Sequence, residues 1–258
     1  MPSQERKMSA MANNDKDIYY ATRFWGLSIG AADRMQKVIK LSKTIHAHNM
    51  LDVGCSGGML TTIIKDTIGV TDVHGIEISV GGMSAANRRG IKAIQLDVDI
   101  NPLPFNDNFF DFVYCGDVIE HLFNPSYLLN EIHRVIRIGG FFLITTPNLS
   151  SWYNRVMLLF GYQPFETAAS LSYPEAGKFS LVEKNIKGLG GEHIRVMTLK
   201  ALKDLMIFHN FKIEKIVGAH GVSSNQNMFM KAVQFVDELA CISPSFATWF
   251  VIKAVKMN

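Results

Sequence analysis

From residue 49 onward the sequence alternates short apolar runs, rich in β-branched and aromatic residues, with segments of helical periodicity. We predict strands over residues 49–54, 72–78, 92–98, 109–116, 139–147, 211–219 and 245–256. Helices are expected near residues 58–68, 80–89, 125–137, 198–210 and 228–242. Strands that alternate with helices form a mostly parallel sheet covered by helices on both faces. The sequence therefore predicts one α/β domain.

The composition limits the kinds of partner that this chain can have. Hydrophobic residues make up 48% of the 258 residues and charged residues 19%, which allows a well-buried core and excludes global disorder. The net charge of +3 argues against a nucleic-acid partner. The sequence also lacks an apolar run of about 18 residues, so we expect no membrane span.

The cysteines and the N-terminus bear on the cellular setting. Cys55, Cys115 and Cys241 have neither paired nor metal-like spacing, as is typical of a reduced intracellular protein. The N-terminus has no apolar signal-peptide region. We therefore predict a cytoplasmic location.

The chain divides into three parts. Residues 1–17 are polar and predict a disordered leader, and residues 18–48 predict an N-terminal helical cap. Residues 49–258 form the main domain, in which residues 148–192 interrupt the regular alternation and predict a lid insertion. Five residues of this lid are candidate contacts to a substrate, with packing inside the lid as the alternative: Trp152, Tyr153, Arg155, Tyr162 and Gln163.

A glycine-rich loop follows the first predicted strand. Residues 52–58 read DVGCSGG, and such a turn before a helix lets a ligand approach the backbone closely. A dinucleotide site requires G-x-G-x-x-G, whereas Ser56 occupies the second glycine position and Met59 the last. A P-loop requires Lys-Ser/Thr after its last glycine, and this loop has none. Both nucleotide interpretations, including a dehydrogenase, are therefore weak.

The same loop resembles the first motif of class I S-adenosylmethionine-dependent methyltransferases, in which it wraps the methionine half of the cofactor. Glu77 ends the second predicted strand and Asp97 the third. The resemblance implies that Glu77 accepts hydrogen bonds from both ribose hydroxyls and that Asp97 lies near the adenine amino group. Motifs in the family's order extend over residues 50–148, with a weaker match over residues 192–218.

The resemblance implies a fold and a set of binding residues. The fold is a Rossmann-like three-layer sandwich with a seven-stranded mostly parallel sheet, the helical cap and a lid after the fifth strand. The implied cofactor-binding residues lie in the loop and at the strand ends: Asp52, Gly54, Cys55, Ser56, Gly57, Glu77, Ile78, Asp97, Val98, Cys115, Gly116 and Asp117. Arg23, in an aromatic and basic cluster over residues 19–25, is a candidate partner for the cofactor's carboxylate. A helix that packs these aromatic rings on the core is the alternative.

Two histidines are candidates for the acceptor side of the reaction. His121 and His193 could act as general bases, and the alternative is that they only shape the pocket. Asp117, Glu120 and His121, with a distant histidine, also resemble the Glu-x-x-Glu-His set that holds magnesium in some O-methyltransferases. Because aspartate replaces the first glutamate here, we predict no bound metal and keep magnesium as the alternative.

The resemblance implies transfer of a methyl group from S-adenosylmethionine to a hydroxyl of a small molecule, such as a sugar, a glycan-linked group or a natural product. The cofactor would leave as S-adenosylhomocysteine. Three alternatives remain: methylation of a small-molecule amine, RNA 2′-O-methylation, and a non-catalytic subunit that binds the cofactor. The sequence leaves a homodimer open.

Overall fold

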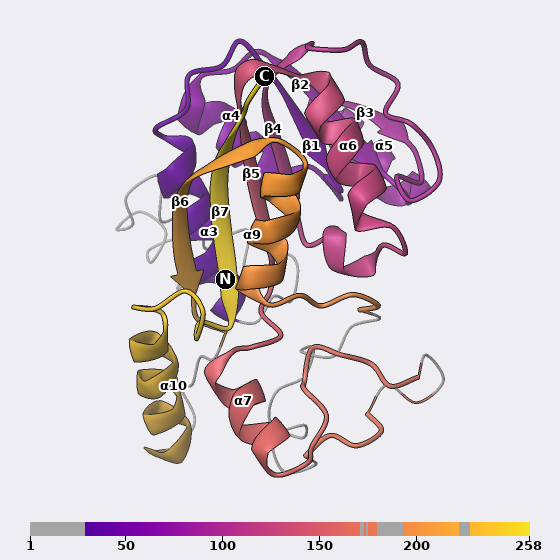
Figure 1. Cartoon of the computed structure of the whole chain (residues 1–258). Coiled ribbons are helices and arrows are strands. Elements are labelled where there is room, and N and C mark those ends of the chain that lie inside the picture. The colour runs from indigo at the N-terminus through magenta and orange to yellow at the C-terminus, as the bar shows by residue number, and fades with distance from the viewer. Residues whose placement is uncertain (1–28, 171–172, 174, 180–192, 222–227) are drawn as a thin grey trace, which may run out of the picture.

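The computed structural model describes residues 29–170, 173, 175–179, 193–221 and 228–258 (Figure 1). The predicted leader, the first part of the predicted cap and the candidate Arg23 lie outside these residues. Within the described residues, no helix combines the length and the apolar character needed to cross a bilayer.

The centre of the fold is a seven-stranded sheet in the order β3-β2-β1-β4-β5-β7-β6. Strand β7 is antiparallel to its neighbours β5 and β6, and the other neighbouring pairs are parallel. The predicted seven-stranded, mostly parallel α/β fold is therefore confirmed. The strands are β1 (Asn49–Val53), β2 (Asp72–Glu77), β3 (Lys92–Gln95), β4 (Phe110–Gly116), β5 (Ile136–Pro147), β6 (Phe211–Ala219) and β7 (Trp249–Lys256).

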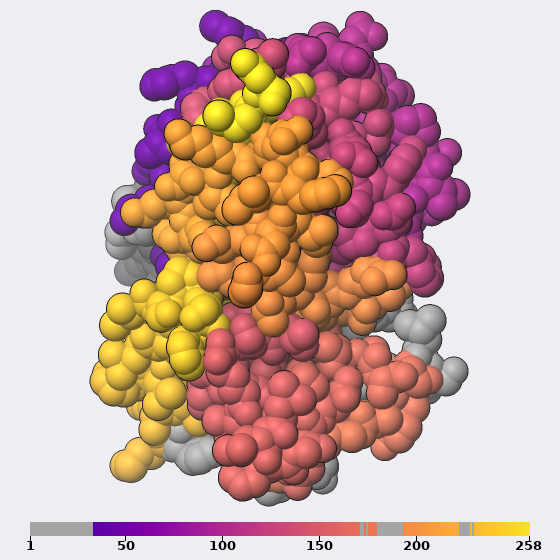
Figure 2. All heavy atoms as spheres, in the orientation of Figure 1, coloured from indigo at the N-terminus to yellow at the C-terminus, as the bar shows by residue number. Residues whose placement is uncertain are grey.

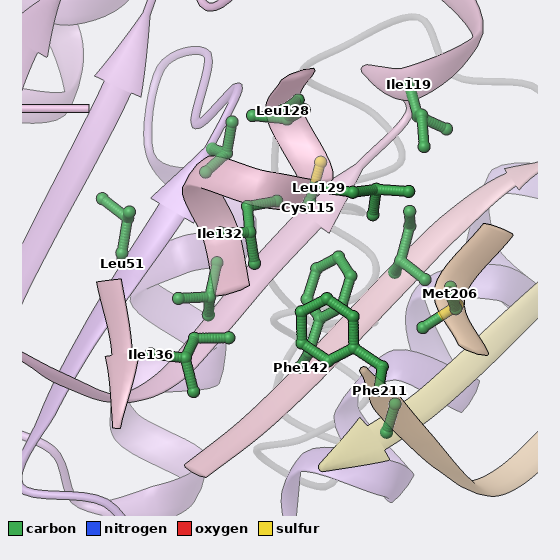
Figure 3. Packing of buried hydrophobic residues seen from close by; sticks show 14 of the residues in the cluster. Leu51, Cys115, Ile119, Leu128, Leu129, Ile132, Ile136, Phe142, Met206 and Phe211 are labelled. Carbon is green, nitrogen blue, oxygen red and sulfur yellow. The ribbon is translucent and has the colours of Figure 1, made fainter. Parts of the chain in front are cut away.

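Helices cover both faces of this sheet. On one face, α3 (Ile29–Ser42), α4 (Met59–Ile68) and α5 (Val80–Arg88) bury Val38, Ile64 and Ala86 against the sheet. On the other face, α6 (Pro125–Val135) and α9 (Leu199–Phe208) form a second apolar cluster (Figure 3). This second cluster includes Leu128, Leu129, Ile132, Phe142, Met206 and Phe211. Burial of this apolar area on two faces is what holds the parallel strands in place.

Several element boundaries differ from the predictions by one to four residues, and β5 begins at Ile136 and not at residue 139; three of the differences have local reasons. The third strand ends at Gln95, not at residue 98, because Asp97 turns the chain: its carbonyl accepts from Asn101 N (3.1 Å). The last strand begins at Trp249, not at residue 245, because Phe246 N donates to Ser243 O (2.8 Å) in a turn. The helix predicted over residues 125–137 ends at Val135, since β5 begins directly after it.

The segment after β5 packs beyond the carboxyl ends of the parallel strands. It begins with α7 (Trp152–Leu159), which lies beside α10 (Met228–Ala240) at this end of the molecule (Figures 1 and 2). Asp237 of α10 joins the two helices, because its carboxylate accepts hydrogen bonds from Trp152 Nε1 (2.8 Å) and Thr248 Oγ1 (2.7 Å). An isolated bridge between Asn148 and Met197 joins the two ends of this segment.

Candidate active site

The glycine loop joins β1 to α4 in a conformation that suits its sequence. Gly54, Ser56 and Gly58 have φ of 79°, 48° and 78°, a region that favours glycine. The Gly54 and Cys55 amides both donate to Ile76 O, at 2.8 and 3.0 Å, which fixes the loop on β2. A Cβ on Gly54 would lie 2.3 Å from Val118 Cγ2, so glycine at this position lets the chain after β4 approach the loop.

Glu77 at the end of β2 is a second anchor for the loop. One carboxylate oxygen accepts from Ser56 N (2.8 Å) and the other from Ser79 N (2.9 Å). The residue is only 9% exposed. Each carboxylate oxygen has another lone pair, so Glu77 can hold the loop and still accept hydrogen bonds from a ligand.

A cleft of about 430 Å³ opens along the ends of β2 and β3. Seven predicted residues line it: the cofactor candidates Gly54, Glu77, Ile78, Asp97, Val98 and Asp117 and the catalytic candidate His121. Ile78 and Phe123 are 64% and 69% exposed, so the cleft has apolar side chains on its rim that suit a flat ring system. The sequence analysis missed Phe123 and Asp99; the Asp99 carboxylate accepts from Phe123 N (2.9 Å) and so fixes this part of the wall.

A second, smaller cleft of about 160 Å³ lies on the other side of the loop. The predicted residues Asp52, Gly54, Cys55, Ser56 and Asp117 line it, together with side chains from α3 and α4. Gly54 and Asp117 line both clefts, which therefore meet at these two residues.

Arg34 of α3 is the cation of the smaller cleft. Its Nη2 lies 2.5 Å from Asp117 Oδ2, and its guanidinium lies over the Trp249 ring, 4.0 Å from the centroid. Its Nη1 is buried and has no hydrogen-bond partner among the described residues. Arg23, the candidate from the sequence for this role, lies outside the described residues, and no local motif marks Arg34, because its place depends on how α3 packs.

Asp52 supplies an acceptor in the same cleft. Thr61 Oγ1 donates to its Oδ2 (2.6 Å), whereas Oδ1 is buried without a hydrogen-bond partner. Burial raises the pKa of Asp52 to about 7, and the nearby Glu77 charge adds to this effect. The cleft thus contains an unsatisfied donor on Arg34 and an unsatisfied acceptor on Asp52. These match the carboxylate and ammonium groups of an amino acid, such as the methionine half of S-adenosylmethionine.

Three predicted cofactor residues line neither cleft. The Cys115 side chain is fully buried in the core, and all three cysteines are free. A Cβ on Gly116 would lie 2.1 Å from Tyr114 Oη, and Gly57 O accepts from Arg89 Nη1 (2.8 Å). These residues support the backbone around the clefts.

The two candidate catalytic histidines lie together. His121 ends a short 3₁₀ helix (Ile119–His121), and its ring centroid is 4.7 Å from that of His193. His193 Nδ1 lies 2.8 Å from Glu166 O, and burial lowers the pKa of His193 to about 4. His193 is therefore a neutral imidazole at physiological pH, as a general base requires.

Glu120 completes a group that could hold a divalent ion. One side-chain atom from each of Glu120, His121 and His193 lies within 4.8 Å of the others. Glu120 Oε2 accepts from Thr146 Oγ1 (2.9 Å), and its buried Oε1 has no hydrogen-bond partner, which leaves a ligand atom for a cation. Asp117, which the sequence analysis included in this set, is outside the group and pairs with Arg34.

The five candidate contacts of the lid line neither described cleft. Arg155 stacks over the Phe246 ring at 4.3 Å, and Tyr162 meets Phe179 edge to face. Gln163 Nε2 donates to Thr167 Oγ1 (2.8 Å). The contacts that these residues make here are those of lid packing.

Known proteins resemble this chain in sequence and in fold. A family model described as "Methyltransferase domain" matches residues 51–144. Ubiquinone biosynthesis O-methyltransferase of Rickettsia conorii is 31% identical over 111 residues, which cover 42% of this chain and 38% of that protein. Phosphoethanolamine N-methyltransferase 2 of Caenorhabditis elegans is 31% identical over 125 residues, which cover 46% of this chain and 28% of that protein. The matched region thus spans less than half the length of these curated relatives.

A solved structure extends the likeness of the fold over nearly the whole chain. It is a chain from the complex of the Haloferax volcanii Trm112 methyltransferase activator with a methyltransferase. At 13% identity it aligns with a TM-score of 0.61 and covers 94% of this chain and 98% of that chain. The sheet order, the glycine loop with its acidic partners and the family match agree with one another. Residues 51–144 match the methyltransferase domain family, and the sheet around them has the fold of class I S-adenosylmethionine-dependent methyltransferases.

Proposed function

We propose that this protein transfers a methyl group from S-adenosylmethionine to a hydroxyl oxygen of a small molecule. The observation that carries the proposal is the position of His121. It lines the larger cleft together with Glu77 and Asp97, and its ring contacts that of the neutral His193. A histidine at the wall of the cleft, in contact with a second histidine, can supply the base that a hydroxyl acceptor needs.

The two clefts divide the task of binding the cofactor. In the larger cleft, Glu77 would accept from the ribose hydroxyls, and Ile78 and Phe123 would flank the adenine ring. In the smaller cleft, Arg34 would pair with the carboxylate and Asp52 would accept from the ammonium group. S-adenosylmethionine, when bound, supplies a methyl group on a positively charged sulfur that is open to displacement from behind.

The protein's part in the reaction is to align the acceptor and remove its proton. When the acceptor oxygen is held in line with the bond between the methyl carbon and the sulfur, a bimolecular reaction becomes effectively unimolecular. His193, or His121 in contact with it, would take the proton of the acceptor hydroxyl, so that the oxygen becomes the nucleophile for the methyl group that the cofactor would supply. Proton removal by a placed base contributes roughly two to four orders of magnitude in rate.

A divalent ion is not required by this proposal. Were one bound, Glu120, His121 and His193 would hold it, and it would lower the pKa of an acceptor hydroxyl. This set has two imidazoles and one carboxylate, whereas magnesium prefers an all-oxygen set.

Two classes of acceptor are candidates. A sugar, a glycan-linked hydroxyl or a natural product is the first candidate, because the sequence layout of TTPN, the lid and HIR is similar to that of bacterial methyltransferases found near such pathways. A small-molecule amine is the second candidate, and the likeness to a phosphoethanolamine N-methyltransferase favours it. A neutral histidine would serve an amine equally well, since it would take the proton of the ammonium form.

Calorimetry and a turnover screen test the proposal. We expect S-adenosylhomocysteine to bind the wild-type protein and to bind Glu77→Ala at least tenfold more weakly. The protein is then incubated with S-adenosylmethionine and panels of sugars, phenols and amines, and the released S-adenosylhomocysteine is measured. His193→Ala should keep the affinity for S-adenosylhomocysteine and lose turnover. Tight binding without turnover on any panel would favour a non-catalytic subunit, and a rise in Tm with NAD alone would favour a dehydrogenase.

A further inference from the structure

A buried polar cluster inside the segment after β5 centres on the side chain of Glu166. This residue is 0% exposed, and both carboxylate oxygens accept hydrogen bonds from α7. Tyr153 Oη donates to Oε1, and Asn154 Nδ2 donates to Oε2 (2.6 Å). Asn154 Oδ1 in turn accepts from Phe165 N (3.1 Å), so the chain at residues 165–166 is fixed to α7 from both sides.

The main chain of Glu166 fixes a different residue, His193. Its carbonyl oxygen lies 2.8 Å from His193 Nδ1. A carbonyl can only accept a hydrogen bond, so Nδ1 carries the proton of the neutral ring. The lone pair is then on Nε2, and the contact with Glu166 sets which nitrogen of His193 is available for chemistry.

A second buried charge accompanies this cluster. The Lys178 side chain is 1% exposed, and its ammonium lies 3.5 Å from a Glu175 carboxylate oxygen. Burying a carboxylate and an ammonium group stabilises a protein less than apolar packing of the same volume, and charges of this kind are retained in some proteins for the geometry they specify. A geometric role is therefore the better explanation for the buried carboxylate of Glu166, whereas Glu175 is 35% exposed and contacts neither Glu166 nor His193 in the described residues.

We propose that Glu166 is a positioning residue for the acceptor-side base. By its hydrogen bonds to Tyr153 and Asn154 it holds its own carbonyl against His193, and thereby presents Nε2 of His193 to the site. This inference rests on the proposed function, in which His193 or its neighbour His121 accepts the proton. It adds a link that no local motif shows: the chemistry of residue 193 depends on a carboxylate 27 residues earlier in the chain.

Side-chain ¹⁵N spectra of the histidines in the whole chain test the proposal, since they report which ring nitrogen carries the proton. The His193 signal is assigned by its absence in His193→Gln. We expect a single Nδ1-protonated form in the wild type and averaged signals from both forms in Glu166→Ala. Glu175→Gln is the matched control, because it removes a lid carboxylate that does not contact His193, and its spectrum should equal that of the wild type. If Glu166→Ala does not fold, Tyr153→Phe and Glu166→Gln take its place, because each disturbs one hydrogen bond of the cluster. Their His193 signals should lie between those of a purely Nδ1-protonated ring and those of an average of both forms.

Affinity for S-adenosylhomocysteine separates this proposal from the proposed function. The residues of the cluster line neither cleft, so the Kd of each variant should stay within about twofold of the wild type. An unchanged His193 signal in the folded variants, with normal affinity, would overturn the positioning role alone. Averaged His193 signals in Glu175→Gln would also overturn the positioning role, because loss of any carboxylate in this segment would then have the effect expected of Glu166→Ala. If the wild-type protein does not bind S-adenosylhomocysteine, the proposed function is overturned instead.

Discussion

Arg34 on α3 and Asp117 after β4 form an ion pair across the smaller cleft, with 2.5 Å between Nη2 and Oδ2. Asp117 has φ of +56°, an uncommon conformation for a residue other than glycine, and its Oδ1 accepts from Thr145 Oγ1 (3.2 Å). The pair therefore places a charged group from the N-terminal helix against the strand end that both clefts share. It also leaves Nη1 of Arg34 available to a ligand.

Replacement of Arg34 by glutamine should weaken the binding of S-adenosylhomocysteine about ten- to a hundredfold. A hydrogen bond to a charged group contributes roughly 1.5–3 kcal/mol, and the variant loses the one between the guanidinium and the ligand's carboxylate. Lys37→Gln is the control, since Lys37 is on the same helix but pairs with Asp33 (2.6 Å) away from the cleft. Calorimetry should show an unchanged Kd for that control. Equal affinity of Arg34→Gln and wild type would remove Arg34 from the site.

Gly54→Ala should destabilise the protein and abolish measurable cofactor binding. The backbone there has φ of 79°, which costs a residue with a Cβ about 1 kcal/mol, and the new Cβ would lie 2.3 Å from Val118 Cγ2. Gly69→Ala is a matched control, because Gly69 has φ of 72° and open space around its Cβ position. Urea denaturation should show a clearly larger decrease in the free energy of unfolding for Gly54→Ala than for Gly69→Ala. Equal losses would mean that the close approach of Val118 has no energetic consequence.

The stability of the ligand-free protein should depend on pH through Asp52. Its pKa is about 7 in the folded state and near 3.8 in the unfolded chain. Below pH 4 both states hold the proton. Between pH 4 and 7 the unfolded chain loses the proton first, so folding becomes less favourable as the pH rises, by up to about 4 kcal/mol.

Asp52→Asn removes this titration. We therefore expect its free energy of unfolding to improve relative to the wild type from pH 4 to pH 7, and the difference to level off above pH 7. Urea denaturation of both proteins at pH 4.5, 6 and 7.5 measures the difference. Parallel curves would show that Asp52 ionises at an ordinary pKa.

Magnesium should have little effect on this protein. The group of Glu120, His121 and His193 offers two nitrogen ligands, and Asp117 is engaged with Arg34. We expect calorimetric titration with magnesium to show no binding at micromolar concentrations. EDTA should leave turnover on any acceptor found by the screen unchanged. Loss of turnover with EDTA and its return with magnesium would instead establish a metal-assisted reaction.

The cofactor half of the site could be predicted from the sequence because that half depends on local order. Glu77 and Asp97 each follow a strand of a parallel sheet, and the carboxyl ends of such strands lie at one edge. The order of the strands along the chain is therefore enough to bring the loop, Glu77, Ile78, Asp97 and Val98 to the wall of one cleft. The order of the strands in the sheet therefore accounts for the proximity of these residues.

The acceptor half and the cation of the smaller cleft could not be predicted in this way. Arg34 reaches the cleft because α3 packs across the sheet near β7, a contact between residues more than 200 positions apart. Glu166 acts through an irregular segment whose hydrogen bonds have no periodic signal. His121 and His193 could be named as candidates, but only the folded chain shows that their rings touch.

Gly54 and Asp117 line both clefts, so the site consists of two adjacent clefts that share these two residues. An adenosine molecule and a methionine molecule would each occupy one cleft and would lose their translational freedom separately. A single ligand that extends through both clefts would lose this translational freedom only once, and its second half would bind at a high effective concentration. The architecture thus favours the intact cofactor and its demethylated product over the free amino acid and nucleoside, which are present in every cell.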